Sequence, residues 1–126
     1  MRTARKMRVL LADGHEEVRK VVREYINSLS SFQVVGEATD GNGAIEEAER
    51  LKPDVVVLDF ELARHNGLEP IRIIKERSAS TKIVIATLFD DPLYKAKAQQ
   101  AHVDGVIVKA SLKHSLASVF STLHQH

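Results

Sequence analysis

The sequence KPDVVVLDFELARHNGLEPIRIIK, residues 52–75, decides the fold. It opens with the apolar run of residues 55–58, whose Val and Leu content is expected of a strand buried on both faces. Asp59 ends that run. Apolar residues then recur at the spacing of a helix, at Leu68, Ile71 and Ile74. The segment therefore predicts a buried strand that ends in a carboxylate and is followed by a helix.

The same pattern repeats through the chain. Four further apolar runs of strand length are present: Met7–Ala12, Phe32–Ala38, 83–86 and 106–108. Helical spacing of apolar or small residues lies between these runs and after the last of them, at residues 18–29, 44–51, 68–74, 96–101 and 112–123. Asp91 and Pro92 predict an N-cap and a first-turn proline for the fourth of these helices, and Ser111 predicts the N-cap of the fifth.

Alternation of five short strands with five helices predicts an α/β fold with right-handed crossovers. Such a chain forms a single parallel sheet with helices on both faces. A doubly wound five-stranded sheet commonly takes the flavodoxin-like order 2-1-3-4-5, and its ligands bind beyond the carboxyl ends of the strands. The switch point of that order lies between the first and third strands, so we expect a ligand there.

Four of the five predicted strands end in a side chain that can do chemistry. Asp13, Asp59, Thr87 and Lys109 follow the first, third, fourth and fifth runs. Taken singly, each has an ordinary explanation as a turn residue, a β-branched strand residue or a solvated edge charge. Taken together, two carboxylates, a hydroxyl and an ammonium meet at one edge of one parallel sheet, which favours a functional site.

The composition bounds the function classes. A chain of 126 residues forms one domain, which we expect over residues 7–123, with an N-terminal arm at residues 1–6 and a C-terminal tail at residues 124–126. The 18 Lys and Arg residues balance 17 Asp and Glu residues, so no global field favours direct contact with nucleic acid or an anionic membrane. There is no Cys and no segment as long as a membrane span or signal peptide, so we expect a soluble, cytoplasmic protein.

The ordered set of segments resembles the CheY-like receiver domain of bacterial two-component response regulators. The segments that carry the resemblance are LLADGHEEVR, VVGEATDGNGAIEEA, residues 52–75, KIVIAT and DGVIVKAS. They are most similar to receivers of the LuxR/NarL-type transcriptional regulators. The resemblance implies that Asp59 accepts a phosphoryl group from a sensor histidine kinase. It also implies an output domain or partner protein and a non-enzymatic role, with at most self-phosphorylation and self-dephosphorylation; homodimers are common in the family.

The resemblance implies a role for each residue at the strand ends. Lys109 pairs with a phosphoryl oxygen, and Thr87 donates its hydroxyl to another oxygen once the phosphoryl group is in place. A divalent cation, usually Mg²⁺, is held by Asp13, Asp59 and the backbone carbonyl of Glu61. In-line phosphoryl transfer to a carboxylate brings anions together, so cationic groups at this edge suit the chemistry.

Three positions depart from the family pattern. Gly14 stands where most receivers have a second acid, and the loss of one carboxylate should weaken Mg²⁺ binding. The side chain of Glu61 could supply the lost carboxylate. Leu88 stands where a small residue is usual, and its bulk should slow both phosphorylation and hydrolysis. Val106 replaces a frequent aromatic residue and has no polar tip, so the usual readout of the switch should be altered.

Three classes of function stay open. The first is a phosphorylation-controlled switch that changes its affinity for a partner near the fourth helix, fifth strand and fifth helix, with control of transcription as the output. The second is a degenerate receiver that acts as a protein-interaction module with impaired Mg²⁺-dependent phosphorylation. The three departures favour it, and the retention of Asp59, Thr87 and Lys109 opposes it. The third, a nucleotide- or flavin-binding protein, lacks a phosphate-binding glycine loop. The six histidines show no ligand spacing and predict no metal group of their own.

Overall fold

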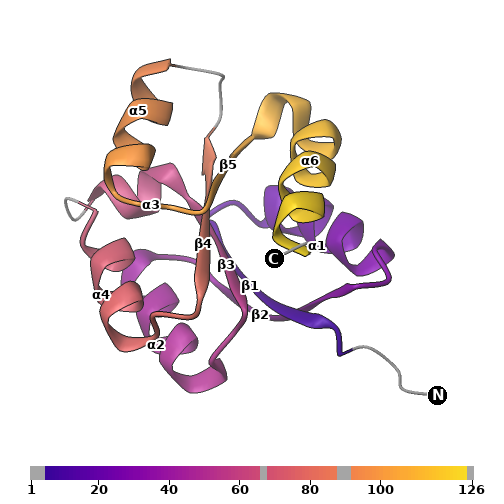
Figure 1. The fold of residues 1–126 in the computed structure, drawn as a ribbon, viewed down its shortest axis with the longest axis horizontal. Coiled ribbons are helices and arrows are strands. Elements are labelled where there is room, and N and C mark those ends of the chain that lie inside the picture. Colours follow the sequence, from indigo (N-terminus) through magenta and orange to yellow (C-terminus); the bar gives the residue numbers. More distant parts are fainter. Residues whose placement is uncertain (1–4, 66–67, 88–91, 125–126) are drawn as a thin grey trace.

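The computed structural model describes residues 5–65, 68–87 and 92–124. Five parallel strands form one sheet in the order β2-β1-β3-β4-β5 (Figure 1). The strands are β1 (Met7–Ala12), β2 (Phe32–Ala38), β3 (Val55–Asp59), β4 (Lys82–Thr87) and β5 (Gly105–Val108). The doubly wound α/β fold and its strand order are therefore confirmed.

Helices cover both faces of the sheet. Figure 1 shows one face covered by two helices, α1 (Glu16–Ser28) and α6 (Leu112–His124). The opposite face carries α2 (Gly41–Leu51), α3 (Phe60–His65), α4 (Glu69–Arg77) and α5 (Pro92–Gln100). A short 3-10 helix, η1 (Lys109–Ser111), joins β5 to α6. Across the described ranges, no helix is both long enough and apolar enough to cross a membrane.

Within the described residues there are six α-helices, where the sequence predicts five. The additional helix is α3, which begins directly after Asp59 in a stretch for which the sequence pattern predicts no helix. Its six residues are too few to repeat an apolar stripe, but Phe60 and Ala63 are both buried and hold the helix against the core. The predicted third helix is α4. The predicted N-cap Asp91 and the departure at Leu88 lie outside the described residues.

The strands read as unbroken apolar runs because both faces of the sheet are buried. In β1, Leu10 and Ala12 pack into the core under α2 and α4. Val9 and Leu11 pack into the second core, under α1 and α6. All four side chains are at most 2 % exposed. A strand in this position has no polar face, so it cannot show the alternation of a half-exposed strand.

The strands end together at one edge of the sheet, as parallel pairing requires. The last paired positions are Ala12 with Leu58, Asp59 with Ala86, and Thr87 with Val108. The residues that follow these positions, including those after β1 and β5, therefore leave the sheet at the same edge. That edge is where the candidate site lies.

Candidate functional site

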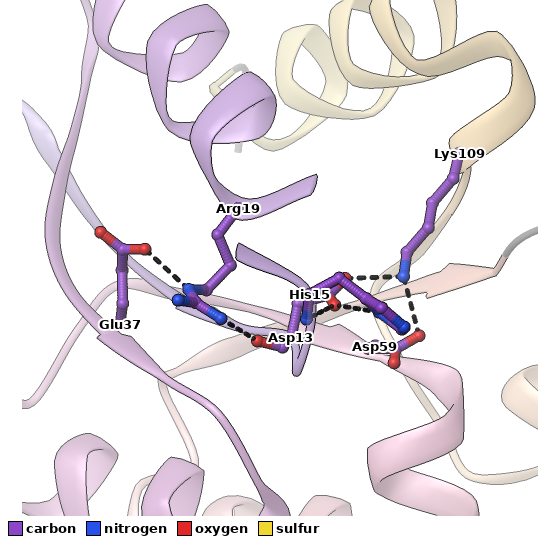
Figure 2. Close-up of polar contacts among 6 residues, drawn as sticks. All are labelled: Asp13, His15, Arg19, Glu37, Asp59 and Lys109. Atoms are coloured by element: carbon purple, nitrogen blue, oxygen red, sulfur yellow. Dashed lines mark hydrogen bonds and ion pairs between the residues drawn. The ribbon is translucent and has the colours of Figure 1, made fainter. Parts of the chain in front are cut away.

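Three charged side chains meet at the carboxyl edge of the sheet (Figure 2). Lys109 Nζ lies 2.6 Å from Asp13 Oδ2 and 3.0 Å from Asp59 Oδ1. The side chains of Lys109, Asp13 and Asp59 are only 9 %, 9 % and 6 % exposed. We call these three residues the acid–lysine–acid cluster. Neighbouring strands β1 and β3 bring the two acids together, and the long lysine stem reaches them from the end of β5.

Thr87 lies at the same edge. It is the last residue of β4, it is 1 % exposed, and it pairs in register with Val108, the residue before Lys109. Val106 is half-buried in β5 and packs against the core under α2 and α4. Of the residues that the sequence assigns to the strand ends, Asp13, Asp59 and Lys109 are in direct contact, and Thr87 stands beside them on the next strand.

The backbone after β1 is held in place by hydrogen bonds to Asp13. The backbone N–H of His15 donates to Asp13 Oδ1 at 2.8 Å, and His15 Nδ1 lies 3.0 Å from the same oxygen. Arg19 Nη1 donates to the backbone carbonyl of Asp13 at 2.7 Å. Gly14 is exposed between them, and a Cβ at this position would meet only the carbonyl oxygen of Thr39, at 3.5 Å. The loop therefore has room for a side chain at Gly14.

Burial and hydrogen bonding act differently on the two carboxyls. Burial raises the pKa of Asp59 above its ordinary value, and the contact with Lys109 offsets this only in part. Burial also opposes the charge on Asp13, but hydrogen bonds from Lys109 and His15 outweigh it and lower the pKa of that carboxyl. Burial acts against the charge on Lys109 too, yet the two carboxylates outweigh it and raise the pKa of the ammonium. Asp59 is therefore the more basic carboxyl of the two.

The donor atoms at this edge fit a divalent cation. One ligand atom from each of Asp13, His15 and Asp59 lies within 4.8 Å of the other two. Carboxylate oxygens are the ligands that Mg²⁺ and other hard cations take. Glu61 lies in the first turn of α3 with an exposed side chain, and its carboxylate is not part of this group. Its backbone instead hydrogen-bonds the Asp59 carboxylate.

His15 is the residue that the sequence prediction missed. The sequence shows no ligand spacing among the histidines, whereas the structure places the ring of His15 beside the two acids. Sequence motifs for metal binding rely on ligands at fixed spacing within one segment of chain. The three candidate ligands here come from the ends of two different strands, β1 and β3. The available signal was the order Asp13, Gly14, His15 directly after a strand, which puts an imidazole two residues past a buried carboxylate.

The fold and the cluster define an α/β domain with a buried acid at its switch point and a lysine bridging two acids. Residues 9–120 match the family model described as the response regulator receiver domain. The match covers most of the chain, and the chain belongs to that family. The sequence resemblance to two-component receivers is thereby confirmed.

Relatives of this chain include both a transcriptional regulatory protein and protein-glutamate methylesterases. It is 38 % identical over 111 residues to the uncharacterized transcriptional regulatory protein YxjL of Bacillus subtilis, covering 88 % of this chain and 51 % of the relative. It is 44 % identical over 86 residues to a protein-glutamate methylesterase/protein-glutamine glutaminase of Pyrococcus abyssi, covering 68 % of this chain and 23 % of the relative. The chain thus spans about half the length of the first protein and about a quarter of the second.

A solved structure has the same fold at similar length. The two-component response regulator of the LuxR family from Aurantimonas sp. SI85-9A1 superposes with a TM-score of 0.84 at 29 % identity. The superposition covers 94 % of this chain and 84 % of that chain. The similarity to receivers of LuxR-type regulators therefore holds in structure as well as in sequence.

Proposed function

We propose that this receiver is a phosphorylation-controlled switch in which Asp59 accepts a phosphoryl group from a histidine of a sensor kinase. The observation that carries the proposal is the acid–lysine–acid cluster, buried at the switch point of the sheet. An ordinary ion pair can lie at the surface. Charges that must neutralise a transferred phosphoryl group act more strongly where water is excluded.

The transfer itself follows from the charges at this edge. An oxygen of Asp59 bonds to phosphorus as the bond from phosphorus to the kinase imidazole breaks, and the electrons of that bond stay on the imidazole nitrogen. Burial makes the Asp59 carboxylate more basic and hence a better nucleophile while it is ionised. Lys109 already contacts an Asp59 oxygen and then pairs with the phosphoryl oxygens. A divalent cation would be held by Asp13, Asp59 and the Glu61 carbonyl, where it would neutralise phosphoryl charge.

Phosphorylation changes which groups Lys109 and Thr87 contact. In the resting state Lys109 bridges the two acids, and Thr87 ends β4 nearby. Once a phosphoryl group is present, Lys109 and the Thr87 hydroxyl bind its oxygens, and the movement of β4 alters the face formed by α5, β5 and α6. Partner affinity changes because the partner contacts the two arrangements differently. The LuxR-type relatives support control of transcription through an output domain or partner protein. We also expect no direct nucleic-acid contact by this domain, because its charges balance, and we expect homodimers, which are common in the family.

Intact-mass measurement tests the proposal directly. The protein is incubated with acetyl phosphate and a divalent cation, Mg²⁺ and Mn²⁺ in separate arms. We expect the mass of one phosphoryl group to be added, and the addition to disappear in Asp59→Asn. Asp40→Asn is the matched control, because the Asp40 carboxylate caps α2 by accepting from Gly43 and is not part of the acid–lysine–acid cluster, and Asn caps helices equally well. Addition that persists in Asp59→Asn contradicts the assignment of the acceptor.

A degenerate receiver is the second candidate. Gly14 removes one acid from the cation pocket, and Val106 gives β5 no aromatic side chain to move. The sequence departure at Leu88 favours the same candidate. If no phosphoryl group is added with any divalent cation, the chain acts as a protein-interaction module that is not controlled by phosphorylation.

A further inference from the structure

His15 lies against the two carboxylates of the pocket. Figure 2 shows its ring reaching from Asp13 toward Asp59, and a ring nitrogen belongs to the group of ligand atoms that lie within 4.8 Å of one another. The side chain is 71 % exposed, so a solvated ion has access to it. A core histidine would be buried and a free surface histidine would not be aligned on a buried carboxylate, and His15 is neither.

The contact with Asp13 places a ring nitrogen of His15 where it can share a cation with the carboxylate. His15 Nδ1 lies 3.0 Å from Asp13 Oδ1, and without a cation a proton joins the two atoms, because an ionised carboxylate only accepts hydrogen bonds. A cation can take the place of that proton, because a neutral imidazole can carry its proton on Nε2 and bind metal through Nδ1.

The charge of the pocket is poorly suited to Mg²⁺. Asp13 and Asp59 contribute two negative charges and Lys109 one positive charge, so the cluster carries a net charge of about −1 before a cation binds. Gly14 adds no charge. Mg²⁺ is a hard ion that binds oxygen ligands and gains from each carboxylate, so it binds this set weakly. A neutral imidazole does not add charge, but it donates an electron pair that first-row transition ions accept well.

We propose that Asp13, His15 and Asp59 form a mixed nitrogen and oxygen site that selects first-row transition cations over Mg²⁺. His15 is the ligand that compensates for the acid missing at Gly14. The inference rests on the proposed function only in using the same pocket, and it concerns which ion the pocket binds in the absence of any phosphoryl donor.

Co²⁺ is the probe, because it binds imidazole and is paramagnetic. Calorimetric titration of the unphosphorylated protein with Co²⁺ and with Mg²⁺ gives the two dissociation constants, and paramagnetic shifts of amide resonances locate the bound Co²⁺. We expect Co²⁺ to bind at least about tenfold more tightly than Mg²⁺. The shifts should be centred on residues 13–15 and 59.

Two variants and one control separate His15 from the other ligands. We expect His15→Asn to weaken Co²⁺ binding by about tenfold and to change Mg²⁺ binding by less than about twofold. Gly14→Asp, which the loop accommodates, should tighten Mg²⁺ binding and reduce the preference for Co²⁺. His114→Gln, an exposed histidine in α6, should change neither constant.

The outcomes distinguish this inference from the proposed function. Unchanged Co²⁺ binding in His15→Asn, equal affinities for Co²⁺ and Mg²⁺, or shifts centred on α6 would each overturn the inference. Phosphorylation of Asp59 in the mass experiment would still support the switch in that case. Conversely, Co²⁺ binding through His15 without any gain of a phosphoryl group would support the metal site and contradict the phosphorylation switch.

Discussion

Two clusters of three charged residues differ in burial and in sign. One is the acid–lysine–acid cluster at the switch point, and the other joins α1 to β2; Figure 2 draws Arg19 and Glu37 of this second cluster. The acid–lysine–acid cluster has one cation between two anions, with side chains no more than 9 % exposed. The second cluster has one anion, Glu37, between two cations. Arg19 Nε lies 3.0 Å from Glu37 Oε1 and Arg23 Nη1 lies 2.7 Å from Glu37 Oε2, with side chains 14–36 % exposed.

The difference in burial determines how strongly the excess charge of each cluster acts. In the Arg19–Glu37–Arg23 cluster, water screens the excess positive charge, so the ion pairs mainly position side chains. In the acid–lysine–acid cluster, the excess negative charge is shielded from water, and it can be offset only by a bound cation or by protonation of Asp59. The acid–lysine–acid cluster therefore favours binding of a cation, whereas the Arg19–Glu37–Arg23 cluster does not.

The largest expected effect comes from removing the buried cation. Lys109→Met leaves two buried carboxylates together without the ammonium that pairs with both, and we expect the free energy of unfolding to fall by about 3–5 kcal/mol at neutral pH. Arg23→Met, which removes a cation from the exposed cluster, should cost less than about 1 kcal/mol. Urea denaturation followed by circular dichroism measures both. Equal losses in the two variants would show that burial does not separate the clusters.

Neutralising Asp59 should have a smaller effect and the opposite sign. Burial raises the pKa of Asp59 in the folded state, so its charge destabilises the fold, and Asp59→Asn should raise the free energy of unfolding by about 1 kcal/mol at neutral pH. Asp13→Asn should lower it, because the folded state favours the Asp13 carboxylate. Thermal melts of the two variants test the pair, and shifts of Tm in the same direction contradict it.

The pH dependence of stability follows from the same shifts. The folded state holds the Asp59 proton longer than the unfolded state, so this group lowers stability as pH rises from the ordinary carboxyl pKa through the raised value. Asp13 acts at lower pH: its contribution is present above the unfolded pKa and is lost as pH falls through the lowered folded value. We expect denaturation curves of Asp59→Asn to lack the first effect and keep the second. A parent and variant with parallel pH profiles would contradict this.

The smallest expected effect concerns the exposed cluster and salt. Arg23→Gln should change the free energy of unfolding by about 0.2–1 kcal/mol at low ionic strength, and the difference should shrink at high ionic strength because exposed charges are screened. The buried cluster should respond much less, so Lys109→Met should keep its deficit at high salt. Chemical denaturation at two salt concentrations measures both, and a salt-independent deficit in Arg23→Gln would contradict the comparison.

The parts of the fold that repeat were predictable from sequence, and the parts that occur once were not. The sheet and its charged edge could be predicted from the apolar runs that are followed by Asp13, Asp59, Thr87 and Lys109. The carboxyl ends of parallel strands all lie at one edge of the sheet, so these residues come together there. The helix α3 was missed because burial of Phe60 and Ala63 alone does not make a periodic pattern.

The site was predicted only where the residues lie at strand ends. His15 was missed because its ring lies near Asp59 only through the turn after β1, and the order Asp13, Gly14, His15 does not by itself place an imidazole near a residue of another strand. Glu61 was expected to offer a carboxylate, but its side chain is exposed in the first turn of α3 and is not part of the group of ligand atoms.

Arg19 has a kinetic consequence. Its guanidinium joins the backbone carbonyl of Asp13 to the carboxylate of Glu37 on β2, so the turn that presents Asp13 and His15 is braced from behind. A braced turn has little to rearrange when an ion arrives. The rate at which a cation binds to Asp13, His15 and Asp59 should then be limited by the loss of water from the ion. Rearrangement of the polypeptide should not limit it.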